Sequence, residues 1–145
     1  MAEIWPDEGL NLVLNIFPRG GTNLTTTYLA LFTAFTASTV GSDTSTADSY
    51  TEPGSGAYAR QSIAAASWGA IADAAANAGR MTTAAQVTFP TATGSWGTVN
   101  GFWLANQLSA TADTAIFAAN FDDTTAVAIQ TNDVIKVTPT IQYNN

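Results

Sequence analysis

The chain has 145 residues and a mass of 15.0 kDa, a size typical of one domain with a single hydrophobic core. Its formal net charge is −7, from 11 acidic and 4 basic residues, and it contains neither cysteine nor histidine. Without these two residue types, disulfides, thiolate nucleophiles, Cys/His zinc sites and histidine acid–base catalysis are excluded. The composition therefore argues against an ordinary intracellular enzyme.

The composition also indicates the class of fold and of partner. Alanine and threonine are the most abundant residues, and a β-branched, glycine-containing chain with few lysines favours short strands joined by turns. Its surface carries few charges, which suits broad contact with other subunits. The basic residues are scattered, so we expect no nucleic-acid binding; they are Arg19, Arg60, Arg80 and Lys136. The apolar runs are too short for a membrane span, so we expect no membrane insertion. The first residues are acidic, unlike a secretory signal, so we expect the protein to be made in a cytoplasm.

Residues 1–21 are expected to form an amphipathic N-terminal arm. Pro6 followed by Asp7 and Glu8 is typical of a helix start, where acidic side chains meet the positive end of the helix dipole. Apolar residues dominate positions 10–17, and the Pro-Arg-Gly-Gly run at 18–21 ends the pattern. Because these apolar residues also alternate, both a short helix and an extended arm stay open.

Residues 25–36 predict a central strand that is buried on both sides, since both of its faces are largely apolar. One face carries Tyr28, Ala30, Phe32 and Ala34, and the other carries Leu29, Leu31, Thr33 and Phe35. Residues 37–56 are rich in Ser, Thr, Asp, Gly and Pro, which predicts a long polar loop. Such a loop is either mobile or ordered by contact with another subunit, and we favour the second.

A strand is predicted at residues 57–63, and two interpretations of residues 64–78 stay open. Alanine-rich composition and a C-capping Gly79 favour a helix across 70–78, whereas Trp68-Gly69 and the neighbouring strands favour extended structure.

The C-terminal half has the clearest strand pattern. Alternating segments predict strands at residues 84–89, 95–106, 114–121, 126–130 and 134–143. Thr131-Asn132-Asp133 between the last two predicts a β-hairpin. Short strands at this spacing indicate an all-β fold, an antiparallel β-sandwich formed by a single domain over residues 22–145.

Carboxylates and tryptophans are the first candidates for chemistry. Asp122 and Asp123 are adjacent, so on a strand they point to opposite faces, and we interpret them as turn residues. Trp68, Trp96 and Trp103 suit either a sugar-binding cleft or the core. No acidic residue lies in strand register with them, and we favour packing.

The polar loop offers a second candidate site. Asp43, Asp48 and Glu52 carry oxygen ligands for calcium, but they lack the regular Asp-x-Asp-x-Asp-Gly spacing, so a solvated loop is favoured. The Gly-Ser-Gly run at 54–56 has no following lysine and helix, and so does not match a phosphate-binding loop. We therefore predict no catalytic, cofactor-binding or metal-binding residues.

Three segments and a turn stand out in combination. Residues 28–33 read YLALFT, residues 56–61 read GAYARQ, residues 87–99 read VTFPTATGSWGTV, and the turn is 131–133. In this combination the chain resembles a group of small bacteriophage virion proteins labelled tail-fibre-like or capsid-associated. The resemblance spans most of the chain and implies a structural part of the virion, without catalysis.

Resemblance and composition together lead to three expected functions, all non-enzymatic and without a cofactor. The first is a capsid decoration, or cement, protein that binds the phage major capsid protein and stabilises the outer shell. The second is a tail or fibre component that binds tail proteins, and the third is a carbohydrate-binding module for host recognition. We expect assembly in the host cytoplasm and self-association, with a trimer favoured, because a small β domain with an apolar arm has surface to bury.

Overall fold

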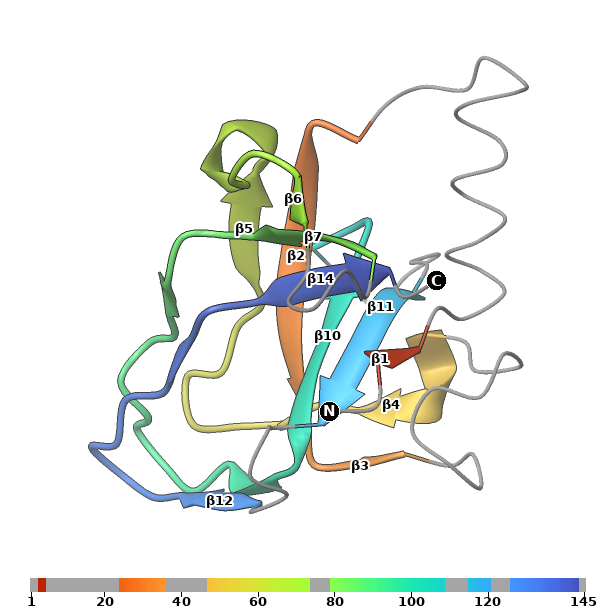
Figure 1. Cartoon of the computed structure of the whole chain (residues 1–145). Coiled ribbons are helices and arrows are strands. Elements are labelled where there is room, and N and C mark those ends of the chain that lie inside the picture. Colours follow the sequence, from red (N-terminus) through yellow and green to blue (C-terminus); the bar gives the residue numbers. More distant parts are fainter. Residues whose placement is uncertain are drawn as a thin grey trace.

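The computed structural model describes residues 3–4, 24–35, 47–73, 79–108, 115–120 and 126–143. In these ranges the chain is all-β, as predicted, with short antiparallel strands and two single 3-10 turns, η1 (Ala47–Ser49) and η2 (Ala65–Ser67) (Figure 1). No helix within them is long and apolar enough to cross a membrane.

The largest sheet has five strands in the order β1-β11-β10-β2-β5. These strands are β1 (Glu3–Ile4), β2 (Thr26–Phe32), β5 (Gln61–Ala64), β10 (Gly101–Ala105) and β11 (Ala115–Asn120). Every neighbouring pair is antiparallel. Of the predicted arm at residues 1–21, only β1 is described, at one edge of this sheet; the expected helix lies outside the described residues.

β2 is the central strand that the alternating pattern predicted. Leu29 and Leu31 face one core cluster while Ala30 and Phe32 face another, and none of the four is exposed. The alternation breaks at Thr33, so β3 (Ala34–Phe35) begins anew. Phe35 then packs edge-on against Phe32, on the face opposite to the one predicted, because the bend shifts the side-chain period.

A long irregular ribbon covers the Leu29 and Leu31 face. Its two arms, residues 80–99 and 127–143, run antiparallel, and Figure 1 shows the ribbon lying over the five-stranded sheet. The paired strands are β7 (Arg80–Thr83) with β14 (Thr140–Tyr143), β8 (Val87–Thr88) with β13 (Lys136–Val137), and β9 (Gly97–Val99) with β12 (Val127–Ile129). Single backbone hydrogen bonds join the arms between these strands, as from Phe89 N–H to the Ile135 carbonyl at 3.0 Å. Because the ribbon consists of separate short sheets, the sandwich stays a prediction.

The predicted hairpin around Thr131-Asn132-Asp133 is wrong, although the turn is present. Asp133 donates its N–H to the Gln130 carbonyl at 3.1 Å, and Asn132 has a positive φ of 75°. The flanking strands pair with β9 and β8 rather than with each other. Ala92 of the opposite arm exchanges backbone hydrogen bonds with Asn132 and Asp133, so the turn is a kink in one continuing arm.

Two segments with open or irregular predictions contain regular structure. The described half of the predicted loop 37–56 holds η1 and β4 (Tyr50–Thr51), which pairs with β3; residues 36–46 lie outside the described ranges. β6 (Ala72–Asp73) pairs with β7, so extended structure, not helix, occupies the described part of 70–78.

The predicted strand over 57–63 starts only at Gln61, which leaves residues 52–60 free to cross the end of the sheet.

Candidate functional site

Tyr58 completes the hydrogen bonding of β2 just beyond the first residue of β5, Gln61. The Leu29–Gln61 pair is the last between these strands, so the next N–H of β2 on that side, at Leu31, has no strand partner. The Tyr58 hydroxyl accepts this N–H at 2.9 Å. The same hydroxyl donates to Glu52 Oε2 at 2.7 Å. One side chain therefore joins the sheet to the 52–60 segment.

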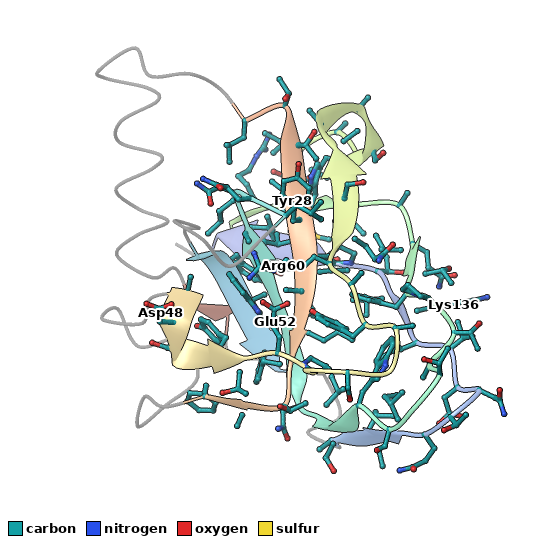
Figure 2. All side chains as sticks on the ribbon, turned by 180° about the vertical axis from the view of Figure 1, so that it is seen from behind. Tyr28, Asp48, Glu52, Arg60 and Lys136 are labelled. Atoms are coloured by element: carbon teal, nitrogen blue, oxygen red, sulfur yellow. The ribbon has the colours of Figure 1, made fainter. Side chains whose placement is uncertain are left out.

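Glu52 also holds Arg60, the one buried charged residue of the described chain, at 8% exposure. Arg60 donates from Nε to Glu52 Oε1 at 3.0 Å and from Nη2 to the same oxygen. Its Nη1 donates to the Gln107 carbonyl at 2.9 Å, and its guanidinium carbon lies 4.7 Å from the centroid of the Trp103 ring. A planar guanidinium suits such combined forked pairing and ring contact. Figure 2 shows Glu52 and Arg60 next to each other beside β2.

Glu52, Tyr58 and Arg60 form a cluster, in which Tyr58 and Arg60 pack against different core clusters. Tyr58 packs edge-on against Trp96, with ring centroids 5.4 Å apart, and stacks on Phe89 under the ribbon. Arg60 lies instead against Trp103, which stacks on Tyr50 at 5.4 Å in the second core cluster. Glu52 binds both Tyr58 and Arg60, so the cluster connects the two core clusters at the end of the sheet.

Burial raises the pKa of the Tyr58 hydroxyl far above its ordinary value, and the neighbouring Glu52 carboxylate raises it further. The hydroxyl therefore keeps its proton and remains a donor to Glu52. A phenol in this state does not act as a general base near neutral pH.

The backbone at Gly56, two residues before Tyr58, contacts the ribbon directly. Gly56 and Ala57 both have positive φ, at 69° and 64°, and this turn places the Gly56 carbonyl against the ribbon. That carbonyl accepts the Trp96 indole N–H at 2.7 Å and the Thr93 N–H at 3.0 Å. The three sequence segments that carry the resemblance, 28–33, 56–61 and 87–99, therefore meet at Tyr58.

Comparison with known proteins identifies the family. The family model of Podophage GP4 fiber I protein gp80 matches residues 9–141, nearly the whole chain. The chain belongs to this family. No curated protein matches it. Membership of the gp80 family confirms the predicted resemblance to phage virion proteins and identifies the chain as a structural virion component.

In this gp80-family member, the tryptophans that suited a sugar cleft are packing residues. Trp103 is completely buried and Trp96 is 4% exposed. Trp68 is half-buried and donates its indole N–H to Thr27 Oγ1 at 3.3 Å. The interpretation as core residues is confirmed for Trp96 and Trp103.

Of the three candidate calcium ligands, Asp48 and Glu52 lie within the described residues. Asp48 is exposed on η1, whereas Glu52 is occupied by Tyr58 and Arg60. Asp43, Asp122 and Asp123 lie outside the described residues. Within the described ranges, no group of three or more acidic side chains could hold a metal ion.

Sequence reasoning misses the cluster itself. It treats Arg60 only as one of the scattered bases and does not distinguish Tyr58 from the other aromatic residues. A weak signal is present, because Glu52 and Arg60 flank an aromatic residue within a segment that carries no other charge.

Proposed function

We propose that this chain is a non-enzymatic structural subunit of a podophage fibre. The observation that carries the proposal is the match of nearly the whole chain to a family whose name describes a fibre protein. Among the three functions expected from the sequence, the family name favours the tail or fibre component over capsid decoration.

The geometry of the cluster formed by Glu52, Tyr58 and Arg60 supports a structural role. Both oxygens of Glu52 accept hydrogen bonds, and Arg60 is engaged by Glu52, Gln107 and Trp103. A catalytic carboxylate needs an oxygen that faces substrate. These groups are instead directed at one another, where they join β2, the 52–60 segment and the loop after β10.

The proposed partners are other tail or fibre proteins and further copies of the same chain, a trimer being the first arrangement to test. The chain has few charged residues, and burying such a surface against a neighbour removes few hydrated charges from water. We propose that the chain binds neither nucleic acid nor membranes. We also propose that it assembles in the host cytoplasm.

Copy number in the virion tests this proposal. Quantitative mass spectrometry of purified particles should give a small, fixed number of copies, and these should co-purify with the tail after the particles are disrupted. Capsid decoration, with the major capsid protein as partner, predicts copies in proportion to the shell subunits. Copies that follow the emptied shells would overturn the assignment to a fibre.

A further inference from the structure

The fold leaves one large apolar side chain, Ile71, mostly in water. Ile71 is 67% exposed, the highest value among the large apolar residues of the described chain. Ala70 and Ala72, on either side of it, are exposed as well. A single exposed apolar residue is common on protein surfaces, so the groups around Ile71 decide whether it has a role.

A β-bulge positions Ile71 next to β6, the edge strand of the β14-β7-β6 sheet. Residues 69–71 lie opposite only Thr82 and Thr83 of β7, so this edge carries one extra residue. Gly69 donates its N–H to the Thr83 carbonyl at 2.9 Å, and the Thr82 hydroxyl donates to the Gly69 carbonyl at 2.8 Å. The bulge is therefore held by its own hydrogen bonds.

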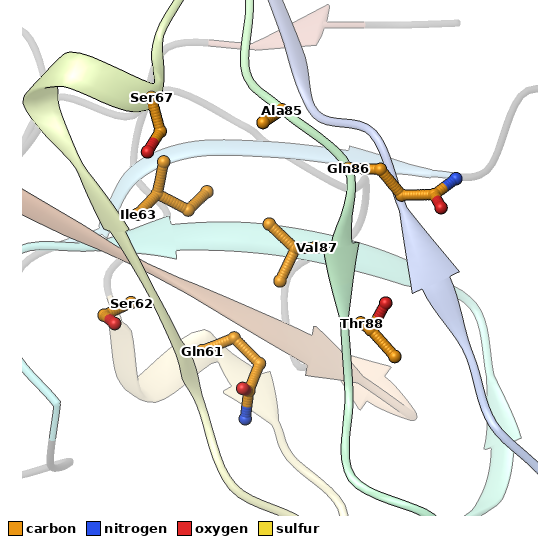
Figure 3. A pocket seen from close by; sticks show the side chains of 8 residues that line it. All are labelled: Gln61, Ser62, Ile63, Ser67, Ala85, Gln86, Val87 and Thr88. Carbon is orange, nitrogen blue, oxygen red and sulfur yellow. The ribbon is translucent and has the colours of Figure 1, made fainter.

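The segment before Ile71 is joined to the ribbon. Ala85 donates its N–H to the Ser67 carbonyl at 2.9 Å. Figure 3 shows β5 and β8 side by side, with a groove of about 270 Å³ between them. Ile63 and Val87 line this groove and pack on the main core. The groove therefore belongs to the packing of the ribbon on the sheet, and the surface that is open to a partner lies beyond it, at Ile71.

An exposed acid and an exposed base lie next to Ile71. Asp73 and Arg80 are directly opposite each other in the β6–β7 pairing and form an ion pair, with side chains 72% and 61% exposed. Ile71 is two residues before Asp73, so in extended backbone the two side chains leave the same face, about 7 Å apart. Within the described ranges, the exposed bases are Arg80 and Lys136.

This combination of charges matches itself. Each copy of the chain has a formal net charge of −7, so two copies repel each other unless acids of one meet bases of the other. A two-fold contact brings the same surface of both copies face to face. Around such an axis, Asp73 of one copy faces Arg80 of the second copy, and the reciprocal pair forms at the same time. The two Ile71 side chains then lie beside these pairs, away from water.

We propose that the surface formed by Ile71, Asp73 and Arg80 binds a second copy of this chain in a two-fold contact. Charge complementarity selects this occupant, because a wholly acidic or wholly basic partner would match only one of the two charges and oppose the other. The inference rests on the self-association proposed above and names the surface that makes it. The contact joins two single chains or two trimers.

Sedimentation equilibrium of the purified chain over a range of concentrations tests the contact. Ile71→Asp should raise the dissociation constant about tenfold or more, so that its assemblies contain half as many chains as those of the unsubstituted protein. Val134→Asp is the matched control, because Val134 is 46% exposed and lies two residues before the other exposed base, Lys136. This control should leave the number of chains unchanged.

Charge reversal provides an arm that does not depend on Ile71. Asp73→Arg leaves two bases at the contact and Arg80→Asp leaves two acids, so neither variant should associate through this surface on its own. Mixed in equal amounts, the two variants should associate as the unsubstituted chain does, because each base of one then faces an acid of the other. Such mutual rescue is expected of a two-fold contact between these positions.

Three results would overturn the inference. They are equal numbers of chains for the unsubstituted protein and Ile71→Asp at every concentration, an equal loss with Val134→Asp, and no association in the mixture of the two charge variants. The fibre proposal is tested separately, because copies that co-purify with the tail support it whichever surface joins them.

Discussion

Gly56 and Gly94 lie so close together that a Cβ atom on Gly56 would stand 2.7 Å from the Gly94 carbonyl oxygen. This approach brings the 56–61 segment against the ribbon and lets Trp96 donate to the Gly56 carbonyl. The contact between these two segments, which are distant in the sequence, thus depends on the missing side chain of Gly56, whereas a Cβ atom on Gly94 would make only an ordinary contact, 3.6 Å from Gly56 Cα.

Gly56→Ala should destabilise the fold more than alanine at Gly97 does. It combines a left-handed backbone, at φ 69°, with contact to main-chain atoms that cannot move aside. We expect a loss of about 3 kcal/mol in the free energy of unfolding. Gly97→Ala is the control, because Gly97 also has a positive φ but has no atom within 4 Å of the added Cβ. It should lose only about 1 kcal/mol, measured by urea denaturation; equal losses would refute the importance of the close contact.

Tyr58→Phe should destabilise the protein although it keeps the aromatic ring. The substitution leaves the Leu31 N–H without its acceptor and removes one donor from Glu52. Burying an unsatisfied group costs about 1–3 kcal/mol, so a loss in that range is expected in denaturant titrations. Tyr28→Phe, at a half-buried tyrosine on β2, should change stability by less than about 0.5 kcal/mol. A Tyr58→Phe variant as stable as this control would show that the hydroxyl is dispensable.

Removing Arg60 should cost far more than removing the exposed Arg80. Arg60→Met leaves the Glu52 carboxylate, whose side chain is 19% exposed, without its cation. A loss of about 3 kcal/mol is expected for breaking such a pair. Arg80 pairs with Asp73 where both side chains are largely exposed, so Arg80→Met should cost less than about 1 kcal/mol. The ranking is checked by chemical denaturation, and similar losses for both variants would contradict it.

Alkaline pH should weaken the fold through Tyr58. Its folded-state pKa is raised above the ordinary value of 10.0, so above that pH the unfolded chain releases a proton that the folded chain retains. Stability from this group is therefore complete below pH 10 and falls above it, by about 1.4 kcal/mol per pH unit. Unfolding titrations between pH 8 and 11 should show this slope, and Tyr58→Phe should reduce it. An identical pH dependence in both proteins would contradict the assignment.

Local pattern predicted local structure well and long-range pairing poorly. The alternation around Leu29 and Phe32 predicted β2 as a central strand with two buried faces, because apolar side chains occupy both faces of the strand. The turn at Asn132 was also visible, but its flanking strands pair with partners across the ribbon, and local turn chemistry does not encode that pairing.

The cluster of Glu52, Tyr58 and Arg60 could not be predicted from the sequence, because it too depends on long-range contacts. Arg60 takes its partners from Glu52 and from the Gln107 carbonyl, which is 47 residues away in the chain. Its guanidinium lies against Trp103 of β10, and the nearby charge of Glu52 alone does not distinguish Arg60 from an exposed base. The all-β class followed from composition and from the spacing of the short alternating segments, whereas the contacts of the cluster follow only from the assembled fold.

Electron microscopy of intact particles labelled with a gold-conjugated antibody against this chain tests the fibre assignment most directly. If the assignment is correct, gold lies along the fibres that project from the particle and the shell is unlabelled. Gold distributed evenly over the shell would contradict it and would favour capsid decoration.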